Sequence, residues 1–68
     1  MKELKMLTPD EVSELLGVPY ATLARWRLNG VGPKWYRLGR HVRYRPDEVA
    51  AWVETQIAAP RAYRDRAN

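Results

Sequence analysis

Two helical patterns separated by only three residues, Gly17-Val18-Pro19, restrict the fold of this chain more than any other feature. The first pattern begins at Thr8, whose hydroxyl can cap a helix, with Pro9 at the first helical position and Glu11 placed to complete a capping box. Glycine is a common residue just past a helix, so the first helix is expected to end at Gly17. Two helices joined by so few residues, one of them glycine, predict a helix-turn-helix unit.

Apolar residues recur at helical spacing in both segments and identify the faces that we expect to be buried. The second helix is predicted over about residues 20–29 and ends at Gly30. The expected core positions are Leu7, Val12, Leu15 and Leu16 in or just before the first helix, and Leu23 and Trp26 in the second.

The opposite side of the second helix suits the major groove of DNA. Alanines let the backbone approach closely, an arginine can contact guanine through its fork, and a leucine can meet a thymine methyl group. Hydroxyl groups on the flanks usually contact phosphate oxygens. The residues concerned are Ala21, Ala24, Arg25 and Leu28 on the face, Tyr20 and Arg27 on one flank, and Thr22 on the other. The alternative is an ordinary solvated helix surface.

Residues 34–38 and 41–45 are rich in aromatic and β-branched side chains and flank the dipeptide Gly39-Arg40, which predicts a β-hairpin. Alternation is expected to place on the inner face Tyr36, Leu38, Val42 and Tyr44. The outward residues would then be Arg37, Arg43 and Arg45, with Arg40 at the tip. The tip of such a wing can enter a minor groove, whose negative potential attracts arginine. The alternative is an edge strand that its charges protect from aggregation.

A third helix is predicted from Pro46 to about residue 57 or 58. Because Arg45 lacks the capping oxygen that Thr8 has, its start should be weaker than that of the first helix. The fold class is therefore mainly α with a small β-hairpin, a winged helix-turn-helix over residues 1–59 followed by a short basic tail over residues 60–68. The core stripe of the third helix is expected to be Val49, Trp52, Val53 and Ile57.

The charges are unevenly distributed along the chain. The formal net charge is +4, and all eight acidic residues lie outside residues 15–46. A stretch of 32 residues with seven basic side chains and no acid favours a polyanionic partner over a merely solvated surface. The seven residues are Arg25, Arg27, Lys34, Arg37, Arg40, Arg43 and Arg45. Arg27, Lys34 and Arg45 are further phosphate candidates beside the helix face and the wing.

Other chemistry finds little support in the sequence. There is no cysteine, and the single histidine, His41, is expected on the wing surface, where it either touches a phosphate or stays in solvent. Two acidic pairs, at residues 10–11 and 47–48, lie in first turns of helices, where capping and the helix dipole explain them. Without a nucleophile–base pair or a cofactor motif, we expect no catalysis, cofactor or metal.

The remaining aromatic residues and the cellular location follow from the same patterns. Trp26 and Trp52 fall on apolar stripes and are expected in the core, whereas Trp35 lies on the face with Arg37 and either packs under the wing or stacks on a partner. No apolar run approaches the ~20 residues that a membrane span needs, and residues 1–6 are too short and too charged for a signal peptide. We therefore expect a cytoplasmic protein without a membrane partner.

Taken together, these motifs resemble the small excisionase/MerR-like winged-helix family, which includes phage excisionases and AlpA-type regulators. The resemblance covers about residues 6–57. It rests on the segments Leu7-Thr8-Pro9-Asp10-Glu11-Val12, Leu15-Leu16-Gly17-Val18, Thr22-Leu23, Trp26, Gly30, Arg37-Leu38-Gly39-Arg40, Val42-Arg43-Tyr44 and Asp47-Glu48-Val49-Ala50-Ala51-Trp52.

The resemblance implies a second helix in the major groove and a wing in the minor groove. One departure from the family concerns Pro19, which stands where many relatives have Ser or Thr and removes the hydroxyl cap with its phosphate contact. By position, the implied contacts are Tyr20, Ala21, Thr22, Ala24 and Arg25 in the helix, and Arg37, Gly39 and Arg40 in the wing.

Within this family the chain looks most like a phage excisionase of the mycobacteriophage type. That resemblance implies a protein that bends double-stranded DNA at an attachment-site arm, binds beside neighbouring copies of itself and directs the phage integrase toward excision. The tail residues Arg61, Arg64 and Arg66 would touch the integrase or the next copy, or simply remain solvated. The alternatives are a transcriptional regulator of phage or prophage genes and, more distantly, an adaptor in phage DNA packaging that binds protein through Leu28 and Trp35.

Overall fold

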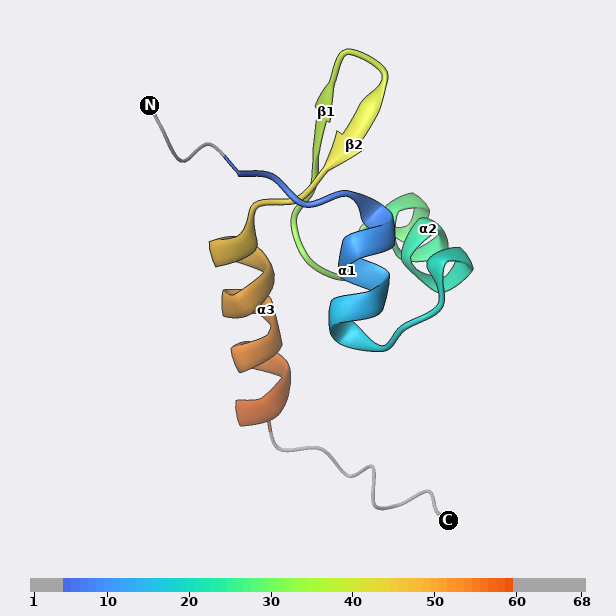
Figure 1. Cartoon of the computed structure of the whole chain (residues 1–68). Coiled ribbons are helices and arrows are strands. Elements are labelled where there is room, and N and C mark those ends of the chain that lie inside the picture. The colour runs from blue at the N-terminus through green and yellow to red at the C-terminus, as the bar shows by residue number, and fades with distance from the viewer. Residues whose placement is uncertain (1–4, 60–68) are drawn as a thin grey trace.

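The computed structural model of the chain describes residues 5–59. Their element order is α1 (Pro9–Leu16), α2 (Tyr20–Asn29), β1 (Tyr36–Leu38), β2 (His41–Arg43) and α3 (Pro46–Ala58). Figure 1 shows α1 between α3 and α2, with the hairpin projecting from one end of this helical layer. The order confirms a mainly helical, winged helix-turn-helix architecture. The tail over residues 60–68, with its three arginines, lies outside the described residues.

Both ends of α1 follow the local chemistry expected from the sequence. The backbone N–H of Glu11 donates to Thr8 Oγ1 at 3.1 Å, and the Thr8 N–H donates to Glu11 Oε1 at 2.8 Å. This reciprocal pair is a complete capping box. At the other end Gly17 adopts a left-handed φ of 69°, which favours glycine.

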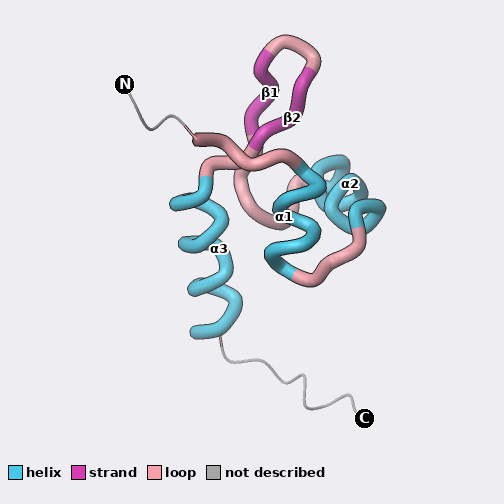
Figure 2. The backbone as a smooth tube through the Cα atoms, in the orientation of Figure 1, coloured by secondary structure: helices cyan, strands magenta, loops and turns pink. Residues whose placement is uncertain are grey.

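The other two helices begin without a side-chain cap. Pro19 precedes α2, and its carbonyl oxygen accepts from the N–H groups of Thr22 and Leu23 at 3.0 and 3.1 Å. Arg45 precedes α3 and likewise makes no capping bond from its side chain to the helix backbone. The expected absence of a hydroxyl cap at both positions is confirmed. Figure 2 shows the loop that joins the end of α1 at Leu16 to the start of α2 at Tyr20.

The core is small, and each helix and the end of the hairpin contribute to it. Its fully buried apolar residues are Val12 from α1, Leu23 from α2, Tyr44 after β2 and Val49 from α3. Further residues pack around them while partly exposed: Leu7, Leu16, Val18, Trp26, Trp35 and Val42. The rings of Trp26 and Trp52 lie 5.5 Å apart between centroids, tilted by 52°. These contacts confirm most of the expected core.

Two expected core positions are wrong. Leu15 is 66% exposed, because Val12 and Leu16 already occupy the core-facing side of the short helix α1. Ile57 is 70% exposed, because it lies in the last turn of α3, whereas the buried Val49 lies in the first. Helical spacing gave the correct stripe, but the protein is too small to cover the whole of it.

The hairpin differs from the expectation in length and in facing. Each strand has three residues, and the pairs are Tyr36 with Arg43, Arg37 with Val42, and Leu38 with His41. Directly opposed residues of an antiparallel pair share a face. Tyr36 and Leu38 therefore share a face with Arg43, and Arg37 shares the other with Val42. The predicted inner face of Tyr36, Leu38, Val42 and Tyr44, and the predicted outer set of Arg37, Arg43 and Arg45, are wrong.

An additional bridge, absent from the sequence-based expectation, holds the chain before α1 against the base of the hairpin. The N–H of Leu7 donates to the Tyr44 carbonyl at 2.7 Å, and the N–H of Tyr44 donates back to the Leu7 carbonyl at 2.8 Å. Both residues pack in or against the core cluster. The bridge thus fixes the hairpin base relative to α1.

Candidate nucleic-acid interface

The outward face of α2 carries the residues that the helical spacing placed there. Leu28 is 87% exposed, and Ala21 and Arg25 are also exposed. Ala24 and Thr22 are only partly exposed, so the accessible face is narrower than the sequence suggested. An arginine, a leucine and an alanine on one exposed helix face give a surface that a DNA groove can receive.

One flank of α2 meets the hairpin through Arg27. Its Nη1 donates to the hydroxyl of Tyr44 at 3.0 Å, and Tyr44 is only 1% exposed. The guanidinium is therefore tied to a core residue that lies 17 positions later in the chain. Tyr20, expected on the same flank, is 49% exposed. The flank that carries Arg27 is the side of α2 that adjoins the wing.

Trp35 links this flank to the wing. The guanidinium carbon of Arg27 lies 5.9 Å from the centroid of the Trp35 ring, and that of Arg37 lies 5.8 Å from the same centroid. Both distances are within the ~6 Å typical of cation–π contacts. Trp35 also packs against the core cluster, which confirms its expected position on the face with Arg37 and places it under the wing.

The tip of the wing is a two-residue turn. Gly39 has a φ of 66°, and it is the only residue of the Gly39-Arg40 pair with a positive φ. A first-position glycine of this kind is a common way to close a two-residue hairpin loop. Arg40 and His41 are exposed at the tip, and Lys34 is exposed where the chain approaches β1.

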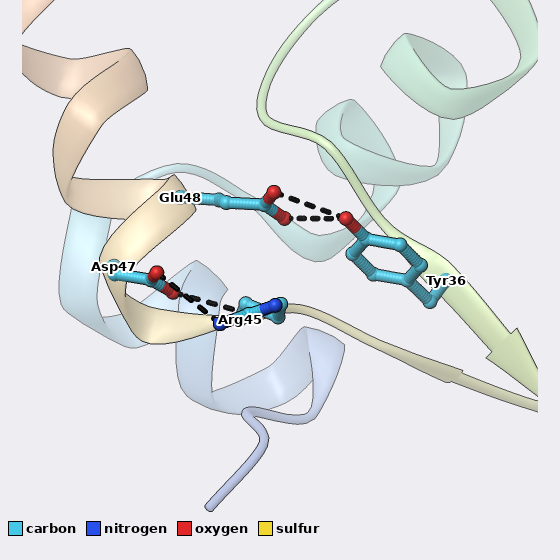
Figure 3. Close-up of polar contacts among 4 residues, drawn as sticks. All are labelled: Tyr36, Arg45, Asp47 and Glu48. Atoms are coloured by element: carbon cyan, nitrogen blue, oxygen red, sulfur yellow. Dashed lines mark hydrogen bonds and ion pairs between the residues drawn. The ribbon is translucent and has the colours of Figure 1, made fainter.

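The face of the wing that carries Tyr36 and Arg43, opposite to that of Arg37, lies next to acidic side chains. Arg45 Nε lies 3.4 Å from Asp47 Oδ1, and the hydroxyl of Tyr36 donates to the two carboxylate oxygens of Glu48 at 2.8 and 3.0 Å. Figure 3 shows both contacts at the start of α3, next to the hairpin base. Arg43 is partly buried, and its Nη1 donates to the Val42 carbonyl at 2.7 Å. Acidic groups therefore face the outer side of the hairpin.

Two pKa values reflect this arrangement. The backbone N–H of Thr8 lowers the pKa of Glu11 below its ordinary value of 4.5, and the charges of Lys5 and Arg43 lower it further. The hydrogen bond to Glu48 raises the pKa of the Tyr36 hydroxyl above its ordinary value of 10.0. Arg43 therefore lies close enough to Glu11 of α1 to lower its pKa, and Arg45 pairs with Asp47 of α3.

The other face of the wing, which carries Arg37 and Val42 and which we call its inner side, has no acidic partner among the described residues, and neither has α2. Within residues 5–59, Arg45 is the only basic residue that forms an ion pair. We use the name α2–wing surface for the basic residues of α2, of the segment before β1, of β1 and of the wing tip, together with the tryptophan that lies between them. These residues are Arg25, Arg27, Lys34, Trp35, Arg37 and Arg40. The surface concentrates charge that no described carboxylate neutralises, so it attracts anions.

The described part of the chain contains no group of three or more His, Cys, Asp or Glu side chains that could hold a metal ion. None of its helices has both the length and the apolar character needed to cross a bilayer.

Comparison with known families decides the assignment. The sequence profile described as "Helix-turn-helix domain" matches residues 6–57, which include every helix and strand except the last residue of α3. The chain belongs to the helix-turn-helix domain family. The family includes excisionase-like and AlpA-type DNA-binding proteins, so this helix-turn-helix domain binds DNA. No curated protein matches the chain.

Proposed function

We propose that this helix-turn-helix protein is a sequence-specific, non-enzymatic DNA-binding protein that acts as a phage excisionase. It places α2 in a major groove and the tip of the wing in the adjacent minor groove. The observation that carries the proposal is the pair of contacts that Trp35 makes with Arg27 of α2 and Arg37 of β1. These contacts join helix and wing into the one α2–wing surface, whose arginines no described carboxylate neutralises.

In the major groove, Arg25 is the proposed base contact. Its exposed guanidinium can form two hydrogen bonds with guanine, while Leu28 meets a thymine methyl group and Ala21 and Ala24 keep the helix close to the bases. Tyr20 and Thr22 contact phosphates at the edges. On this assignment Arg25→Ala costs ~1–3 kcal/mol on the cognate site and relaxes the preference at one base position.

In the minor groove, the proposed contacts come from the tip. Gly39 and Arg40 enter the groove, His41 lies beside it, and Arg37 and Lys34 contact the backbone. Arg43 and Arg45 belong to the opposite, acid-lined side of the hairpin, so we assign them no DNA contact. This revises the sequence-based set, which placed all wing arginines on one edge.

As an excisionase, the protein bends attachment-site DNA, binds next to neighbouring copies and contacts the integrase, so that recombination runs toward excision. It breaks no bond itself. The resemblance of its motifs to those of excisionases supports this role. The competing role, regulation of phage or prophage genes, uses the same interface because the family also contains AlpA-type proteins.

Two experiments test the proposal. Binding to duplex DNA should weaken by roughly 10³-fold between ~50 and ~200 mM salt if about six phosphates are neutralised. A flat salt response, or no binding at low salt, contradicts DNA binding through this surface and favours a protein-binding adaptor.

The second experiment separates the two DNA-dependent roles. An integrase-dependent excision assay should require this protein and should lose activity with Arg40→Ala. The matched control is Arg45→Ala, on the opposite side of the wing, which should retain activity. Excision that proceeds equally without the protein, while a reporter gene responds to it, supports the regulator instead.

A further inference from the structure

We infer that Arg27 and Arg37 hold one phosphate of the DNA backbone between them, and that Trp35 is the positioning residue that keeps the two guanidiniums at this site. The inference rests on the proposed DNA-binding function and adds to it a specific phosphate site where the recognition helix meets the wing. Its ligand is a single phosphodiester of double-stranded DNA.

Geometry brings the two arginines together from separate elements. Each guanidinium carbon lies within 6 Å of the same ring centroid, so the two carbons are no more than about 12 Å apart, the sum of the two distances. A phosphate can accept a hydrogen bond from both when the two side chains turn toward it, because each guanidinium offers several donors in a fork on a long side chain. The site therefore takes one donor from α2 and one from β1.

Two contacts and the strand register limit the positions of these side chains before DNA binds. Arg27 donates to the hydroxyl of Tyr44, which is buried in the core. Trp35 packs against the core cluster and provides the ring next to which both guanidiniums lie. The register places Arg37 on the same face as Val42, which also packs against the core, and not on the outer face with Tyr36 and Leu38. Side chains restrained in this way lose less entropy on binding.

Charge explains why the ligand is an anion. Two positive groups beside the same aromatic ring repel each other, and an anion that contacts both relieves that repulsion. No described carboxylate forms an ion pair with Arg27 or Arg37, whereas Arg45 on the opposite side of the hairpin has Asp47 at 3.4 Å. The protein thus neutralises one side of the wing internally and leaves the pair beside Trp35 available for an external phosphate.

The salt dependence of binding tests whether the phosphate is shared. The probe is a short, mixed-sequence DNA duplex with a fluorescent label, since phosphate contacts do not depend on sequence. The variants are Arg27→Gln, Arg37→Gln and both together. Each single change should lower the slope of log affinity against log salt by about 0.9, and the double change should lower it by the same ~0.9, because only one phosphate contact is lost.

The opposite results are equally clear. A double variant whose slope falls by ~1.8 shows that the arginines neutralise two separate phosphates, which overturns the shared site while leaving DNA binding intact. Unchanged slopes in all three variants show that the pair contacts no phosphate and only stabilises the fold. A wild-type protein with no salt-dependent binding refutes the proposed function itself.

The role of Trp35 requires a second set of variants. Trp35→Leu removes the ring and should lower the slope as the arginine changes do, whereas Trp35→Phe keeps an aromatic face and should restore the wild-type slope. Thermal unfolding of each variant, at the same salt, separates this effect from stability. If both variants change only the melting temperature, Trp35 is structural and its positioning role is refuted. Arg45→Gln, whose partner is Asp47, is the control and should leave the slope unchanged.

Discussion

The substitution Gly32→Ala tests how closely the loop between α2 and β1 packs against the helices. Gly32 has a φ of 87°, and an added Cβ would lie 2.8 Å from Trp26 Cε3 and 3.3 Å from Trp26 Cβ. The ring cannot retreat freely, because its centroid lies 5.5 Å from that of Trp52. Gly30 is the matched control, with a φ of 71° and no atom within 4 Å of the added Cβ.

The expected losses follow from these two environments. A left-handed backbone costs alanine roughly 1–2 kcal/mol, which applies to both glycines. At Gly32 the added methyl group also forces the Trp26 ring to move, which typically costs about 1–3 kcal/mol more. Since a domain of this size has a free energy of unfolding of only ~3–5 kcal/mol, Gly32→Ala should bring it close to unfolding, while Gly30→Ala should leave it folded.

Urea denaturation followed by far-ultraviolet circular dichroism measures both losses. A lower midpoint at an unchanged m-value indicates a loss of stability without a change in the unfolding reaction. The tryptophan fluorescence of the folded protein, to which Trp26 contributes, is a second signal and should change in the Gly32 variant alone. Equal losses of stability for Gly30→Ala and Gly32→Ala would refute the reasoning, because backbone conformation alone would then account for both.

Two further predictions concern hydrogen bonds. Tyr44→Phe removes the acceptor for Arg27 and should cost about 1–2 kcal/mol of unfolding free energy and weaken DNA binding, while Tyr36→Phe on the opposite side should leave DNA affinity unchanged. Denaturation and fluorescence anisotropy measure these effects, and equal DNA losses would contradict the assignment of faces. Because the pKa of Glu11 is lowered in the fold, its contribution is complete above pH 4.5 and is lost as the pH falls through the folded-state pKa. Glu11→Ala should therefore destabilise the protein more than Glu14→Ala near neutral pH, and urea titrations should show this difference shrinking in acid.

Local chemistry made the helices predictable. Thr8, Glu11 and Gly17 specify the ends of α1 through contacts within a few residues, and these contacts occur as expected. The facing of the hairpin was less accessible, because alternation within one strand does not fix the register between two strands. The signal was nevertheless present, since a two-residue turn at Gly39-Arg40 pairs Arg37 with Val42 and so sets the faces.

Contacts between segments that are distant in the sequence could not be predicted from local sequence patterns. The bond from Arg27 to Tyr44 joins α2 to the residue after β2, and the bridge from Leu7 to Tyr44 joins the segment before α1 to that same residue. Neither residue type nor spacing encodes such pairs, because they depend on how the helices and the hairpin pack together. The place where α2 and the wing meet therefore follows only from the three-dimensional structure.

The distribution of acids explains why only one side of the wing is suited to DNA. The acidic groups at the starts of α1 and α3 cap or stabilise those helices, and the fold also brings them to the outer side of the hairpin, beside Arg43 and Arg45. The acidic side chains at the helix starts thus also neutralise one face of the wing, whose two strands have three residues each. Arg37, on the other face, keeps its charge beside Arg27 and Trp35. Under the proposed function, this charge difference orients the domain as it approaches a phosphate backbone, with α2 and the Arg37 face of the wing turned toward the DNA.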